Sequence, residues 1–89
     1  MALPAWKVAE DVAEGYVTLN PVVLKKYTLS EVNALAVELD KVSRETRSQV
    51  TPSDDSDAAQ KKNRRLLRLS QATLVLQTHK SRMGRSSSG

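Results

Sequence analysis

Residues 28–49 constrain the fold of this chain more than any other stretch, because their apolar residues recur at alternating spacings of three and four. This spacing is that of a coiled-coil seam, in which one side of a helix packs against a second helix. Thr28 and Glu31 also have the T-x-x-E spacing of a capping box at a helix start, with Ser30 as the alternative cap. We therefore predict one amphipathic helix over about residues 29–49. Its seam positions are Leu29, Val32, Leu35, Leu39, Val42 and Thr46.

A second stretch, residues 58–83, repeats this pattern and is the predicted partner of the first. Pro52 ends the first helix, because proline cannot continue one, and residues 53–55 are candidate caps for the second. We favour capping over a calcium loop for this acidic cluster, because it has no glycine at the turn and no closing glutamate. Gly84 is the expected end of the second helix. The second seam consists of Leu66, Leu69, Thr73, Leu76 and Met83.

The two long helices, joined by the polar loop 50–57, are expected to form an antiparallel hairpin. The heptad pattern pairs residues whose numbers total about 111. The expected contacts join Thr46 to Leu66, Val42 to Leu69, Leu39 to Thr73 and Leu35 to Leu76. At the edges of the seam, the same register places Glu45 near Arg65 and Glu31 near His79.

Residues 4–27 are expected to form one or two short helices. The first has apolar residues at helical spacing and ends at Gly15, and the second begins with Asn20 as cap and Pro21 as first helical residue and runs for about two turns. Residues 16–20 alternate too briefly to form a strand without a partner, so we interpret them as a connector.

The second long helix has more apolar surface than one neighbour can cover. Leu67 and Leu74 lie seven residues apart and point away from the seam. The short N-terminal helices are the simplest candidates to cover Leu67 and Leu74. The alternative is that a second copy of the chain or a different protein covers them. Trp6 is a candidate anchor for a partner, although packing within its own chain is the interpretation we favour, and Val37 is expected to be exposed. The candidate apolar partner-binding residues are thus Leu67, Leu74, Trp6 and Val37.

The last third of the chain is basic, since no acidic residue follows Asp57 and the net charge is +4. A basic helical face of this kind suits phosphates or an acidic protein groove. We favour a solvated face that partly pairs with the acidic edge of the first long helix, because no recognised nucleic-acid-binding motif is present. The basic face consists of Lys61, Arg64, Arg68, His79 and Arg82. The acidic edge consists of Glu31, Glu38 and Glu45.

Nothing in the sequence indicates catalysis, a cofactor or a metal ion. The carboxylates are scattered over helices, His79 is the only histidine and there is no cysteine, so neither a catalytic triad nor a thiolate metal site is expected. The start of the chain does not resemble a secretory signal, and no run of about 18 apolar residues occurs. We therefore expect an intracellular protein, cytoplasmic or nuclear, that is not an enzyme.

These patterns predict an all-α protein with a single domain over residues 1–84 and a flexible tail at 85–89. The domain is expected to be a small helical bundle built on the antiparallel coiled-coil-like hairpin of about residues 29–49 and 57–83. The predicted function is that of a non-catalytic helical protein–protein interaction module, an adaptor or an assembly subunit of a larger complex. Its partner is another protein or a second copy. The alternative is a nucleic-acid or acidic-surface binder that uses the basic face.

Overall fold

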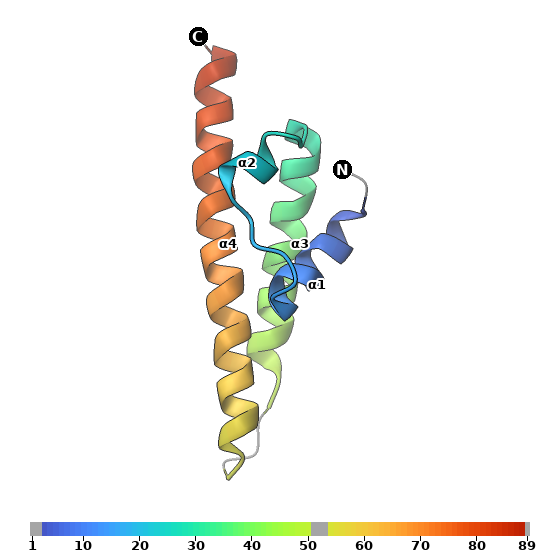
Figure 1. Ribbon diagram of the computed structural model, residues 1–89, viewed down its shortest axis with the longest axis vertical. Helices are drawn as coiled ribbons and strands as arrows, with labels where there is room; N and C mark the ends of the chain where they lie inside the picture. Colours follow the sequence, from blue (N-terminus) through green and yellow to red (C-terminus); the bar gives the residue numbers. More distant parts are fainter. Residues whose placement is uncertain (1–2, 51–53, 89) are drawn as a thin grey trace.

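The computed structural model describes residues 3–50 and 54–88, with side chains described as far as Met83. These residues contain helices α1 (Ala5–Glu14), α2 (Pro21–Leu24), α3 (Leu29–Ser48) and α4 (Ser56–Ser88), and no strand. Figure 1 shows an elongated hairpin of α3 and α4, with α1 lying across both long helices and α2 beside the C-terminal half of α4. The molecule measures 54 × 23 × 19 Å. The predicted all-α hairpin with short N-terminal helices is confirmed.

The caps of the long helices follow the sequence closely. The Thr28 hydroxyl accepts a hydrogen bond from the Glu31 amide (3.2 Å), and the Glu31 carboxylate accepts one from the Thr28 amide (2.8 Å), which completes the predicted capping box. Asp55, from the group of candidate caps, accepts from the Ala58 amide at 3.0 Å and begins α4. The predicted end at Gly84 is wrong, since α4 continues to Ser88. Glycine weakens a helix but ends it only where the backbone turns left-handed, and Gly84 has no positive φ.

The N-terminal segment is held by two local motifs. Gly15 adopts φ 86°, and the amides of Gly15 and Tyr16 donate to the carbonyls of Val12 (3.1 Å) and Asp11 (2.8 Å), which is the Schellman pattern that ends α1. Asn20 caps α2 through a 2.9 Å bond from the Val23 amide, as predicted. α2 is shorter than the two turns expected. It ends at Leu24, and the chain then forms a turn at residues 25 and 26. The connector over residues 17–20 is neither helix nor strand.

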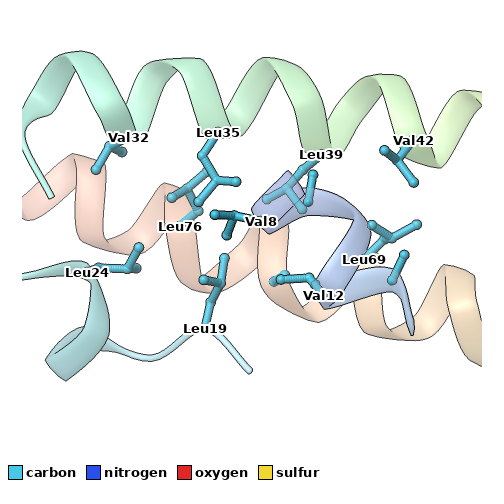
Figure 2. Packing of buried hydrophobic residues seen from close by; sticks show 13 residues of the cluster. Val8, Val12, Leu19, Leu24, Val32, Leu35, Leu39, Val42, Leu69 and Leu76 are labelled. Atoms are coloured by element: carbon cyan, nitrogen blue, oxygen red, sulfur yellow. The ribbon is translucent and has the colours of Figure 1, made fainter. Parts of the chain in front are cut away.

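The expected register of the hairpin is supported by contacts across it. Arg65 Nε donates to Thr46 Oγ1 at 3.2 Å, and Lys62 Nζ donates to the Gln49 carbonyl at 2.7 Å. Both pairs fit the register derived from the seams. Figure 2 shows Leu35 directed toward Leu76 and Val42 toward Leu69, as the same register requires. The two heptad seams therefore fix how α3 and α4 align.

One apolar core holds the four helices together. α1 inserts small and branched side chains against both long helices, while Leu19 of the connector and Leu24 of α2 cover α4 (Figure 2). Leu29, the first predicted seam position, is exposed because it begins α3 beyond the covered region. No described helix combines the length and the apolar character needed to cross a membrane. The buried apolar residues are Val8, Ala9, Val12, Ala13, Leu19, Leu24, Val32, Leu35, Leu39, Val42, Leu69, Ala72 and Leu76.

Leu39→Ala is expected to lower the free energy of unfolding by about 2–5 kcal/mol, because Leu39 is fully buried and its truncation leaves a cavity in the core. Val37→Ala, on the exposed side of the same helix, is the matched control and should change stability by less than about 0.5 kcal/mol. Urea unfolding followed by circular dichroism measures both. Equal losses for the two variants would contradict this packing of α3.

Candidate interaction surface on the last helix

α4 keeps two large apolar side chains exposed, although it packs against other helices on two sides. α3 covers one side, and α1 with the segment after it covers a second. Leu67 and Leu74 lie on neither side and are 58% and 68% exposed. The prediction that the short N-terminal helices cover Leu67 and Leu74 is therefore wrong. The buried apolar residues of α4 are Leu69, Ala72 and Leu76 instead, which belong to the core that α3 and the N-terminal segment share.

An apolar groove runs beside Leu74, where the connector crosses α4. Its first part is a hollow of about 420 Å³ whose lining includes Val17, Leu19, Leu74 and Val75. A second part of about 240 Å³ continues along α4, with Leu74 and Val75 again in its wall, together with Pro21. Leu74 thus forms the outer rim of a depression that side chains from another molecule can enter.

Trp6 and Val37, the other two predicted apolar contacts, are exposed but lie on different elements. Trp6 is 53% exposed at the start of α1, so the favoured interpretation of a Trp packed within its own chain is not what the structure shows. That end of α1 lies beside α3 and away from α4 (Figure 1). Val37 is 65% exposed on α3. The four predicted residues therefore do not form one patch, and Leu67 and Leu74 remain as the pair that shares a helix face.

Two arginines of α4 hold the C-terminal end of α1. Arg68 Nη1 donates to the Ala13 carbonyl at 3.0 Å, where a cation interacts favourably with the negative end of the helix dipole. Its guanidinium also lies against Gly15, so close that a β-carbon there would come within 3.1 Å of Arg68 Cζ. Arg65 donates to the Glu14 carboxylate and to Thr46, and so links α1, α3 and α4. The sequence had placed Arg65 near Glu45, and it contains no local signal for the pairing with Glu14, 51 residues away.

The predicted basic face is divided by the fold. Lys61, Arg64 and Arg68 line a hollow of about 700 Å³ between the ends of α1, α3 and α4, together with the acidic Glu14. His79 and Arg82 line the groove near Pro21 instead. Residues 69–78 separate the two groups and carry no charge, which corresponds to about 15 Å of helix. All three cations of the first group are exposed, and Arg68 in addition donates a hydrogen bond to α1.

No family model matches the chain, and no curated protein or solved structure is significantly similar to it. Within the described part of the chain, no three His, Asp or Glu side chains gather as a metal ion would require. The chemistry of the surface on α4 is therefore the basis for a functional proposal.

Arg68→Ala is expected to lower the free energy of unfolding by about 1 kcal/mol, because the Ala13 carbonyl loses a charged hydrogen-bond donor. Arg64→Ala removes an exposed arginine one turn earlier and should cost less than about 0.5 kcal/mol. Chemical denaturation of both variants measures the difference. If Arg64→Ala proved as costly as Arg68→Ala, the anchoring of α1 would not depend on this bond.

Proposed function

We propose that this protein is a non-catalytic helical interaction module, an adaptor or assembly subunit, that presents the outer face of α4 to a protein partner. The observation that carries the proposal is the exposure of Leu67 and Leu74, two large apolar side chains seven residues apart on the longest helix. Exposed apolar side chains that share one helix face are typical of a surface that another helix covers. The groove beside Leu74 adds depth to this surface.

The dimensions of the hairpin also support an assembly role. α4 has 33 residues against 20 in α3, so it is the longer arm of the hairpin by about 20 Å. A chain of 89 residues buries a modest core, and association with a partner would add stability that the chain alone does not supply.

Leu67→Gln/Leu74→Gln is expected to abolish capture of partner proteins while leaving the fold intact. Both side chains are exposed, so the double change should alter the free energy of unfolding by less than about 1 kcal/mol. The measurement is affinity capture from cell extract with the wild-type and variant chains, followed by identification of the proteins whose recovery differs. Circular dichroism confirms that helicity is retained.

Val37→Gln is the control for this experiment, because it removes an exposed apolar side chain from α3. Capture should survive this change. If Val37→Gln removed the partners and the α4 variant kept them, the working surface would lie on α3. If no recovered protein depended on Leu67 and Leu74, the proposal would be wrong.

A second candidate function is binding to nucleic acid or to another acidic surface, and the hollow lined by Lys61, Lys62, Arg64, Arg65 and Arg68 favours it. Three of these five cations already have partners within the chain: Lys62 donates to Gln49, Arg65 to Glu14 and Thr46, and Arg68 to Ala13. We rank this candidate second because those bonds reduce the charge left for a ligand.

Lys61→Glu/Arg64→Glu tests the second candidate without disturbing α1. If the basic hollow binds phosphates, affinity for duplex and single-stranded probes should fall steeply between about 0.05 and 0.2 M salt, and the double variant should weaken it further. Fluorescence anisotropy with labelled probes measures both effects. Absence of binding at low salt, or binding unchanged by the double variant, would exclude the basic hollow as a nucleic-acid site.

A further inference from the structure

The outer face of α4 carries an exposed row of residues at heptad spacing, two of them leucine, in addition to the seam that packs on α3. Six positions at alternating spacings of three and four lie along this face, and all six side chains are exposed. We call them the outer seam. They are Gln60, Asn63, Leu67, Ser70, Leu74 and Gln77. The spacing is that of helices that pack along their length, so the outer seam has the geometry of a helix-binding face about 25 Å long.

Charge is absent from the outer seam, although cations lie around its first half, within residues 61–68, and follow it at residues 80 and 82. Lysine and arginine occupy neighbouring positions of α4, and none falls on the six seam positions. A solvated helix face has no physical reason to exclude charge, whereas a face that becomes buried does, because an unpaired charge is costly to desolvate. Asn63, Ser70 and Gln77 form a polar row beside the row of Leu67 and Leu74. Polar residues in a seam fix register and partner choice at some cost in affinity.

The flanks of the outer seam indicate the charge of its occupant. Arg64 lies next to the seam on one side and Lys80 on the other. Lys61 and Arg68 lie farther from the seam, on the same side as Arg64. Residues 58–83 contain no aspartate or glutamate. In helix pairs the positions beside the seam carry opposite charges on the two partners, so this surface is complementary to a helix with acidic flanks.

A second copy of this chain does not provide such a helix. If two α4 helices met on their outer seams, two helices that are basic over residues 58–83 would lie side by side, and the cations of neither would meet an acid over that range, because it contains none. Like charges beside a seam oppose pairing. The outer face of α3 is no better suited, since its exposed large apolar residues, Leu29 and Val37, are eight positions apart. Asp40 and Arg44 form an ion pair on the same helix.

We propose that the outer seam of α4 binds an amphipathic helix of another protein whose flanking positions carry glutamate or aspartate. This inference rests on the proposed function and specifies the chemistry of the partner. The polar row would meet uncharged polar residues of the partner helix, and Leu67 and Leu74 would meet its apolar row. Apolar side chains of the partner would also fill the groove formed by Val17, Leu19 and Val75.

Two synthetic helical peptides of about four heptads test this chemistry on the full chain. Both have leucine and glutamine alternating along the seam, and they differ only at the flanking positions, which are glutamate in one and lysine in the other. We expect the glutamate peptide to bind at least about tenfold more tightly at about 0.05 M salt, with the preference shrinking at about 0.5 M salt as charges are screened. Fluorescence anisotropy of labelled peptides measures the affinities.

Variants of the chain locate the binding. Leu67→Gln/Leu74→Gln should weaken the glutamate peptide at least about tenfold, and Val37→Gln should leave it unchanged. Arg64→Glu/Lys80→Glu should reverse the preference between the two peptides. Equal binding of both peptides, binding of neither, or indifference to the Leu67 and Leu74 changes would overturn the inference.

Sedimentation velocity of the free chain gives an independent outcome. Self-association that Leu67→Gln/Leu74→Gln abolishes would show that a second copy occupies the outer seam, and would overturn the acidic-helix inference. The proposed function fails separately, when capture from extract yields no protein that depends on Leu67 and Leu74. Capture that depends on these leucines, through a segment that is not acidic, would keep the function and reject this inference.

Discussion

The fold depends on the apolar contact between α3 and α4, because neither helix buries its seam without the other. Leu35, Leu39, Leu69 and Leu76 are fully buried in that contact, and α1 closes the side that the two long helices leave open. Helices in water gain most of their stability from packing of an amphipathic face rather than from intrinsic propensity. The hairpin therefore fixes the position of every other element, including the face of α4 that remains free.

The arginines of α4 show how one helix serves both the fold and its surface. Arg65 and Arg68 point toward the end of α1, where Arg65 donates to the carboxylate of Glu14 and Arg68 to the carbonyl of Ala13. Lys61 and Arg64 lie one turn away and stay exposed. A basic face that looks uniform along the sequence thus divides into residues that position α1 and residues free to interact with a partner. Substitutions that treat the face as one unit would confuse loss of structure with loss of binding.

α4 is apolar on more sides than its own chain covers, and the outer seam is the side that stays exposed. The positions that share the outer seam with Leu67 and Leu74 are uncharged, while Arg64, Arg68 and Lys80 lie off it. This arrangement differs from that of Trp6 and Val37, which are exposed singly on α1 and α3. Isolated exposed apolar residues are ordinary on protein surfaces, whereas Leu67 and Leu74 share one helix face and Leu74 borders an apolar groove.

The sequence alone determined which segments form helices and how the two long helices align, although it did not determine where α2 and α4 end. Heptad spacing, the Thr28–Glu31 capping box, the Asn20–Pro21 start and the Gly15 stop all act over a few residues, and each is present in the structure. Only the tertiary structure decided where the N-terminal segment packs, because that depends on contacts between residues far apart in the chain. Arg65 meets Glu14 rather than its expected neighbour, and Trp6 is left outside the core. The docking of α1 therefore determined which apolar residues of α4 stay uncovered, and no local pattern encodes that choice.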